Sequence, residues 1–267
     1  MKKSSTLPKK IDVVMLTKNS EEILEKCLDS LYKNVPVKRL IIVDGFSQDR
    51  TIDILENYNK EYSNIKIIQD SGTRATARQK GIKAVKTKWF MFLDSDIILC
   101  KDWFKKASNY IKENVGMIWG VNIDVVPGLK SELFFRAFKK FSVGYFKIRG
   151  GLHDTLLLLD AVKDIKIPSS LHCYEDYYIM QFVINKGYTV AIPDGLYCFH
   201  LRPTIDWELR EGLKLAFEEI KYGLFKCHRF KCVFYYPFLL FYWVLQKIKR
   251  RKSSSKGFSL SYMNAKP

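Results

Sequence analysis

Short apolar runs alternate with segments of helical periodicity across residues 11–93 of this 267-residue chain. The runs are rich in β-branched or aromatic residues, which is typical of buried strands. They are Ile11–Leu16, Leu40–Val43, Ile65–Gln69 and Trp89–Leu93. The helical segments between them are Glu21–Tyr32, a segment from Ser47 through Tyr58, and Ala75–Val85. This alternation predicts an α/β fold with a predominantly parallel central sheet that has helices on both faces.

Polar residues follow each predicted strand at its C-terminal end. Thr17, Asp44 and Asp70 follow the first three strands, and Asp94 and Asp96 follow the fourth. Ligands of parallel α/β sheets bind beyond the carboxyl ends of the strands. We therefore expect these residues to contribute to one ligand site.

The segment Asp94-Ser95-Asp96 places two carboxylates directly after the apolar run Trp89–Leu93. Two acids at the end of a buried strand are costly without a partner, and carboxylate oxygens are suitable ligands for Mg²⁺ or Mn²⁺. A metal ion held in this way can bind a diphosphate. The alternative interpretation is an Asp-rich turn or a helix cap.

The composition is that of a globular protein, with 47% hydrophobic and 27% charged residues. The formal net charge of +17 favours polyanionic partners, namely nucleic acid, an anionic membrane surface or phosphorylated substrates. No nucleic-acid-binding motif is recognisable, so nucleic acid is not expected. The six cysteines are scattered without a Cys-x-x-Cys pair, which fits free thiols in a reducing cytosol.

The chain is predicted to have one globular domain over residues 1–226, with halves 1–115 and 116–226, and a basic, apolar segment over 227–267. The run Cys232–Leu245 is shorter than the roughly 20 residues of a membrane-spanning helix. We expect it to lie on an anionic membrane surface beside basic residues, with a disordered tail after it. A core helix or an oligomer contact is the alternative.

Four segments resemble family 2 glycosyltransferases, which have the GT-A fold. Val13–Asn19 resembles the first nucleotide-contact loop of the family, and Val43–Thr51 resembles its V-D-x-x-S-x-D-x-T segment. Ala77-Arg78-Gln79-Lys80-Gly81 resembles the helix that precedes the Asp-x-Asp strand, and Glu175-Asp176 resembles the acidic pair beside the sugar acceptor. Two departures are Gly45-Phe46, where many relatives have a second acid, and Gln79 in place of Asn.

The resemblance implies a nucleotide-sugar donor, with UDP favoured over GDP, and a Mn²⁺ or Mg²⁺ cofactor. It assigns Asp44 to the base, Asp94 to the ribose and Asp96 to the metal, with His200 as a further metal ligand. The predicted donor-binding residues are Thr17, Asn19, Asp44, Asp70, Gly72, Arg78, Asp94, Ser95 and Arg202.

The resemblance also implies a single displacement with inversion at the anomeric carbon. Asp176 is the candidate general base that takes the proton of the attacking hydroxyl, and Glu175 is the second candidate. An acidic first turn stabilised by the helix dipole is the alternative for this pair.

The predicted function is metal-dependent transfer of a sugar to a glycan or polyprenyl-linked acceptor at the cytoplasmic face of the membrane. The alternatives are a sugar nucleotidyltransferase and a non-catalytic protein that binds anionic lipid or nucleic acid. The sequence leaves the sugar, the sugar acceptor and the oligomeric state open.

Overall fold

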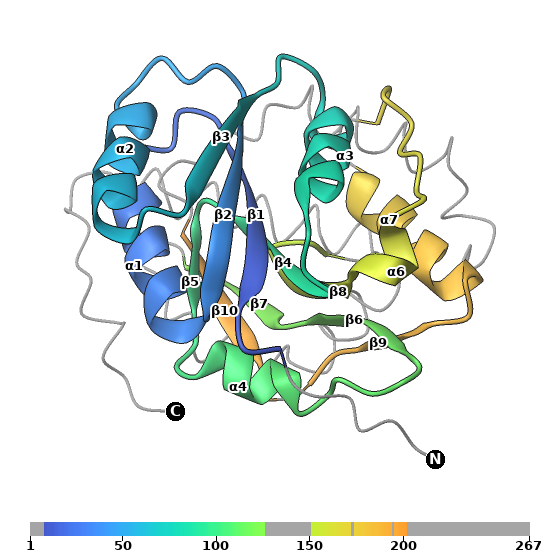
Figure 1. Cartoon of the computed structure of the whole chain (residues 1–267). Coiled ribbons are helices and arrows are strands. Elements are labelled where there is room, and N and C mark those ends of the chain that lie inside the picture. Colours follow the sequence, from blue (N-terminus) through green and yellow to red (C-terminus); the bar gives the residue numbers. More distant parts are fainter. Residues whose placement is uncertain (1–7, 126–150, 172–173, 194, 202–267) are drawn as a thin grey trace, which may run out of the picture. The chain divides into compact units, whose positions relative to one another are not determined.

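The computed structural model describes residues 8–125, 151–171, 174–193 and 195–201 (Figure 1). Three predicted features lie outside these residues: Arg202, the membrane-associating segment 227–267 and the 226/227 domain boundary. The chain divides into two compact units, Met1–Asp124 with Phe138–Leu201, and Val125–Ala137 with Arg202–Pro267. Apart from Val125, every residue described below belongs to the first unit.

The central sheet has seven strands in the order β3-β2-β1-β4-β8-β6-β9. Strands β1 to β4 are mutually parallel where they pair, and β8 is antiparallel to both β4 and β6. The strands are β1 Ile11–Thr17, β2 Val37–Asp44, β3 Ile65–Gln69, β4 Trp89–Asp94, β6 Val115–Trp119, β8 Asp154–Leu158 and β9 Thr189–Ala191. The prediction of an α/β fold with a mostly parallel sheet is confirmed.

Helices cover both faces of this sheet. Residues 11 to 15 of β1 are all fully buried although successive side chains point to opposite faces. In Figure 1, α1 and α2 lie together on the left, and α3, α6 and α7 lie together on the right. The helices are α1 Leu24–Asn34, α2 Thr51–Tyr62, α3 Arg74–Ala84, α4 Trp103–Ser108, α6 Leu159–Val162 and α7 Glu175–Asn185. In the part of the chain that the structure describes, none of them is long and apolar enough to cross a membrane.

A second sheet of three strands has the order β5-β10-β7 and consists of β5 Ile97–Leu99, β10 Tyr197–Leu201 and β7 Val121–Val125. Strand β10 pairs antiparallel with β5, and His200 lies opposite Ile97. The backbone N–H of Leu201 donates to the carbonyl of Asp96 at 2.9 Å. This pairing brings the C-terminal strand to the acids that follow β4.

From its apolar residues Met117, Ile118 and Trp119, the segment Gly116–Val125 is predicted to be one strand. This prediction is wrong, because β6 and β7 are separate strands in different sheets. They are divided at Gly120, whose N–H donates to Asp154 Oδ1 at 3.3 Å. A Cβ at Gly120 would lie 2.1 Å from Asp154 Oδ2. The chain therefore leaves the central sheet at a glycine that a buried carboxylate contacts.

A buried ion pair fixes the start of β4 beside β1. The Asp12 carboxylate is fully buried, pairs with Arg39 of β2 and accepts from the backbone N–H of Lys86 at 2.7 Å. Burial alone would raise the pKa of Asp12, but the Arg39 and Lys86 hydrogen bonds outweigh it, and the pKa is lowered from 3.8. Asp12 thus ties two strands to the segment that enters β4.

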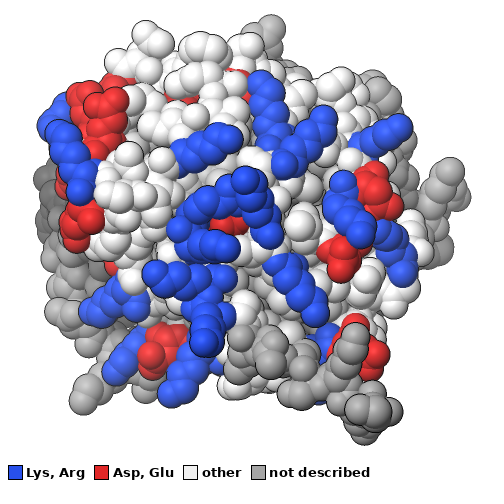
Figure 2. All heavy atoms as spheres, viewed as in Figure 1, with Lys and Arg blue, Asp and Glu red and all other residues white. Residues whose placement is uncertain are grey.

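Lys and Arg side chains are spread widely over one face of the molecule and exceed the acidic side chains there (Figure 2). Exposed basic residues of α3 and of the segment between α3 and β4 are Arg74, Lys80, Lys83, Lys86 and Lys88. Such a face suits a negatively charged partner.

Replacement of Gly81 by alanine should destabilise the fold. In most helix interiors this change stabilises by about 0.5–1 kcal/mol. A Cβ at Gly81 would, however, lie 2.4 Å from Val14 Cγ1 of β1. Overpacking of this kind costs about 1–3 kcal/mol, so urea unfolding should show Gly81→Ala to be less stable than wild type.

Gly195→Ala is the control, because none of the described residues other than its chain neighbours lies within 4 Å of a Cβ at that position. Its stability should stay within about 0.5 kcal/mol of wild type. A Gly81→Ala protein as stable as wild type would show that α3 does not depend on this close approach to β1.

Candidate active site

The polar residues predicted at the strand ends lie along one edge of the central sheet. Thr17 pairs with Asp44 in the β1–β2 register, and Leu16 pairs with Asp94 in the β1–β4 register. Asp70 follows β3, and its N–H donates to the carbonyl of Asp44 at 2.9 Å. The parallel register therefore brings these four chain segments together.

The Asp44 carboxylate is fully buried and holds the loop after β2. Its Oδ1 accepts from Thr17 Oγ1 at 2.9 Å and from Ser47 Oγ at 2.6 Å. Its Oδ2 accepts from the Ser47 N–H at 2.9 Å. Both carboxylate oxygens are thus engaged by the protein itself.

Asn19 locks the loops after β1 and β2 to each other. Its N–H donates to Ser47 Oγ at 2.9 Å, and its Oδ1 accepts from the Gln48 N–H at 2.9 Å. Between Asp44 and Ser47, Phe46 has a φ of +59°. The left-handed region costs a residue other than glycine about 1–2 kcal/mol, and these hydrogen bonds offset that cost.

Asp70 and Gly72 shape the turn that leads into α3. Asp70 pairs with Lys80 at 2.6 Å and accepts from Thr76 Oγ1 at 2.6 Å. Burial would raise the pKa of Asp70, but Lys80 and Thr76 together lower it from 3.8. A Cβ at Gly72 would lie 2.2 Å from Thr76 Oγ1. The turn therefore needs glycine, and α3 begins in a fixed direction.

Arg78 of α3 connects the acid at the end of β4 with the acid at the start of α7. Its side chain is about 5% exposed, and its Nη2 donates to Asp94 Oδ1 at 2.7 Å. Its Nε lies 4.0 Å from Glu175 Oε1, and its guanidinium lies 4.7 Å from the centre of the Phe92 ring. Among the described residues, Arg78 Nη1 and Glu175 Oε2 have no hydrogen-bond partner. Both atoms are buried.

Asp94 remains ionised because of this neighbour. Burial would raise the pKa of its carboxyl, but the Arg78 guanidinium, with smaller effects of His153 and His200, lowers the pKa from 3.8. Ser95 Oγ lies 3.0 Å from Ser20 Oγ of the loop after β1. The Asp94-Ser95-Asp96 segment is thus held from α3 on one side and from the first loop on the other.

Asp96 and His200 form the pair predicted as metal ligands. His200 Nε2 lies 2.7 Å from Asp96 Oδ2, and the Asp96 side chain is 37% exposed. His200 Nδ1 lies 3.3 Å from Asn122 Nδ2 of β7, which orients the imidazole ring. A carboxylate oxygen and an imidazole nitrogen that lie this close together fit a divalent metal such as Mn²⁺.

Glu175 and Asp176 occupy the first turn of α7 in different environments. Glu175 is buried, and burial together with the charge of Asp176 raises its pKa to about 7 despite Arg78. Asp176 is half-buried, and its Oδ1 accepts from the Tyr177 N–H at 2.7 Å. Glu175 therefore holds a proton near neutral pH much more readily than an ordinary glutamate.

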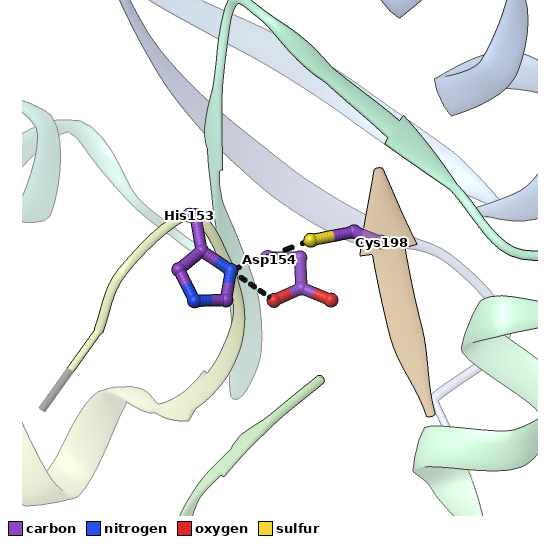
Figure 3. Close-up of side chains that lie close together, drawn as sticks. All are labelled: His153, Asp154 and Cys198. Carbon is purple, nitrogen blue, oxygen red and sulfur yellow. Dashed lines mark hydrogen bonds and ion pairs between the residues drawn. The ribbon is translucent and has the colours of Figure 1, made fainter. Parts of the chain in front are cut away.

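His153, Asp154 and Cys198 form a buried cluster in which the three side chains point toward one another (Figure 3). The His153 carbonyl accepts from the Asp94 N–H at 2.9 Å. Asp154 Oδ1 pairs with His153 Nδ1, and Asp154 Oδ2 accepts from Trp103 Nε1 at 2.8 Å. The cluster thus fixes the backbone of Asp94 through the hydrogen bond to the His153 carbonyl.

The sequence prediction missed this cluster, since its residues are far apart in the chain and match no motif. Their ligating atoms all lie within 4.8 Å of one another, as metal ligands do. Burial, together with Asp154, raises the pKa of the Cys198 thiol well above 9.0, however. Metal binding needs the thiolate, and the oxygens of Asp154 already have partners. The arrangement is therefore that of a structural hydrogen-bond network.

Comparison with known proteins agrees with the motifs. The family model described as glycosyl transferase family 2 matches residues 12–154, which is more than half of the chain. A poly(ribitol-phosphate) beta-glucosyltransferase of Bacillus spizizenii is 34% identical over 129 residues, covering 44% of this chain and 20% of that protein. The poly(ribitol-phosphate) beta-N-acetylglucosaminyltransferase TarS of Staphylococcus aureus is 26% identical over 202 residues, covering 71% of this chain and 35% of TarS. The chain thus spans about a fifth to a third of the length of these two relatives.

Solved structures have the same fold. A crystal structure of S. aureus TarS matches with a TM-score of 0.57 and 22% identity, covering 73% of this chain and 60% of that one. A mannosyltransferase of Pyrobaculum calidifontis, in complex with GDP-Man and Mn²⁺, matches with a TM-score of 0.58 and 13% identity over 76% of this chain and 59% of that one. The GT-A fold predicted from the sequence is confirmed. The family match over residues 12–154, with the predicted motifs inside it, shows that this chain belongs to glycosyl transferase family 2.

Proposed function

We propose that the chain is a metal-dependent, inverting glycosyltransferase that moves a sugar from a nucleotide-diphosphate sugar to a hydroxyl group. The arrangement around Asp94-Ser95-Asp96 carries this proposal. Asp96 contacts His200, a metal-type ligand, while Asp94 contacts Arg78, which reaches the acidic pair on α7. Donor-side and acceptor-side groups therefore meet at one edge of the sheet.

The proposed donor is a UDP-sugar. The chain resembles TarS, for which complexes with UDP-GlcNAc and with UDP have been solved. In our proposal the nucleotide lies over the carboxyl ends of β1, β2 and β4. The loops there contain Thr17, Asn19, Asp44 and Ser95, and Asp70 and Gly72 fix the neighbouring turn. A GDP-sugar is the second possibility, since the Pyrobaculum protein was solved with GDP-Man.

Asp96 and His200 would hold the metal ion. An imidazole ligand suits Mn²⁺ better than Mg²⁺, which prefers oxygen ligands. When bound, the ion would offset negative charge that develops on the leaving diphosphate. Arg78 supplies positive charge beside the same region, and its Nη1 is directed to no partner among the described residues.

Asp176 is the proposed general base, and Glu175 is the second candidate. The buried Glu175 is the member of the pair with the raised pKa, of about 7. When two adjacent carboxyl groups have different environments, the one whose neutral form is favoured keeps the proton, and the other acts as the base. Asp176 would remove the proton from the attacking hydroxyl on the side opposite the leaving diphosphate, which gives inversion.

The proposed sugar acceptor is a hydroxyl of a glycan, including a polyol-phosphate polymer or a polyprenyl-linked glycan. The two curated relatives are named for poly(ribitol-phosphate), which is a polyanion. The excess of Lys and Arg on the face in Figure 2 supports an anionic sugar acceptor. We also propose that the protein acts at the cytoplasmic face of the membrane, in contact with anionic lipids.

Asp96→Asn should abolish metal-dependent transfer while the fold is retained. The amide removes the charged ligand from the Asp96–His200 pair, so activity should fall at least about a hundredfold, the scale of losing one strong electrostatic contribution. Turnover of UDP-sugars at increasing Mn²⁺ measures this, and EDTA should stop the wild-type reaction. Asp53→Asn, an exposed change on α2, is the control. If Asp96→Asn turned over at the wild-type rate, Asp96 would not be a ligand of the metal.

Asp176→Asn should lower the rate of transfer by a factor of about 10² to 10⁴, the contribution of a general base. Glu175→Gln should have a smaller effect, because glutamine resembles the neutral form that Glu175 favours. Single-turnover rates with saturating donor compare the two variants. If the rate fell strongly in Glu175→Gln and stayed at the wild-type value in Asp176→Asn, Glu175 would be the general base instead of Asp176.

Glu175 should make stability depend on pH in a defined direction. Its pKa is about 7 in the folded protein against 4.5 ordinarily, so the folded protein binds more protons over this interval and wild-type stability falls as pH rises. At about 1.4 kcal/mol per pKa unit, the loss is on the order of 3 kcal/mol. Urea unfolding should therefore show Glu175→Gln gaining stability relative to wild type between about pH 5 and pH 8. A difference that stays constant with pH would show that Glu175 is ionised throughout.

A further inference from the structure

Phe46 presents an aromatic ring to solvent from a backbone conformation that aromatic residues rarely adopt. Its φ is +59°, in the left-handed region, and its side chain is 52% exposed. It is the most exposed large hydrophobic residue in the described part of the chain. Water contact and an unfavourable φ both oppose this placement, so packing within the protein does not explain it.

The loop that contains Phe46 is held rigidly by its neighbours. The Asp44 carboxylate accepts from Ser47 through both of its oxygens, at 2.9 and 2.6 Å. Gln48 Nε2 donates to the Phe46 carbonyl at 3.1 Å, and Asn19 Oδ1 accepts from the Gln48 N–H at 2.9 Å. Unfavourable backbone conformations that are fixed in this way occur preferentially at ligand sites.

Asp44 is engaged in holding this loop. Its side chain is fully buried, and its oxygens accept from Thr17 and Ser47. The side chain that the loop presents to solvent beside Asp44 is the ring of Phe46.

The position of this loop fits the nucleoside part of the donor. The metal-type pair Asp96–His200 follows β4, and α7 with its acidic pair packs against β6 and β9, beyond β4 in the sheet order. The nucleoside must extend in the other direction, across β1 toward β2. Two strand spacings are about 10 Å, which is the scale of a nucleoside, and β2 ends two residues before Phe46.

We propose that Phe46 is the residue on which the nucleobase of the donor stacks. This inference rests on the proposed function, since it requires a nucleotide donor at this edge of the sheet. A ring offers a flat apolar face to any base, so stacking adds affinity without selecting the base. Burial of the ring under the base would also remove its exposed apolar surface from water.

Calorimetric titration of the full chain with UDP in the presence of Mn²⁺ tests the proposal. Phe46→Gly and Phe46→Asn both remove the ring and suit a positive φ, with a flexible and a stiffer backbone respectively. Each should bind UDP about tenfold more weakly, equivalent to about 1.4 kcal/mol, without a lower melting temperature. Phe46→Tyr keeps the ring and should retain wild-type affinity. Ser63→Gly is the matched control, since Ser63 also has a positive φ, of 49°, at the end of α2.

Pyrophosphate with Mn²⁺ is the probe without a base, and all variants should bind it as wild type does. Unchanged UDP affinity in Phe46→Gly and Phe46→Asn overturns the inference alone, because the wild type still binds the nucleotide. Weaker binding in Phe46→Gly only would assign the effect to flexibility of the loop and also overturn it. A wild type that binds neither UDP nor GDP overturns this inference together with the proposed function.

Discussion

The contact between Arg78 and Asp94 is the interaction on which the candidate site depends. It joins α3 to the end of β4 through a 2.7 Å hydrogen bond, and it places the rest of the guanidinium beside Glu175. A buried guanidinium without its carboxylate would be an uncompensated charge, which is strongly destabilising. The features that shape α3, namely Gly72, the Asp70–Lys80 pair and the close approach of Gly81 to β1, therefore act on the site through Arg78.

Much of the fold was predictable because its signals are local. Apolar runs and helical periodicity predicted β1 to β4 and their helices, and the parallel order then placed their polar ends at one edge. The partners of each acid were not predictable, since they depend on tertiary packing. Glu175 and Asp176 are adjacent in sequence, yet only Glu175 is buried, and burial is the main cause of its raised pKa. No residue-spacing rule distinguishes them.

The cluster of His153, Asp154 and Cys198 illustrates the same limit. Asp154 is fully buried, and its carboxylate contacts Trp103 of α4, the N–H of Gly120 and the side chain of His153. These contacts exist only after β8 has paired with β4 and β6. The sequence pattern predicted one strand over Gly116–Val125, because periodicity contains no signal for a glycine that a distant carboxylate requires.

Exposure divides the acids at the sheet edge into two groups with different roles. Asp44 and Asp70 are buried, and their oxygens accept from the protein's own loops, so they shape the edge of the sheet. Asp96 and Asp176 are partly exposed, so the proposed metal ion and hydroxyl would reach them without disrupting a loop of the described residues. An acid at a strand end thus predicts the place of a site, and its burial decides whether it binds the ligand or holds a neighbour that does. Asp44 holds the loop that contains Phe46 in this way, as Asp70 holds the start of α3.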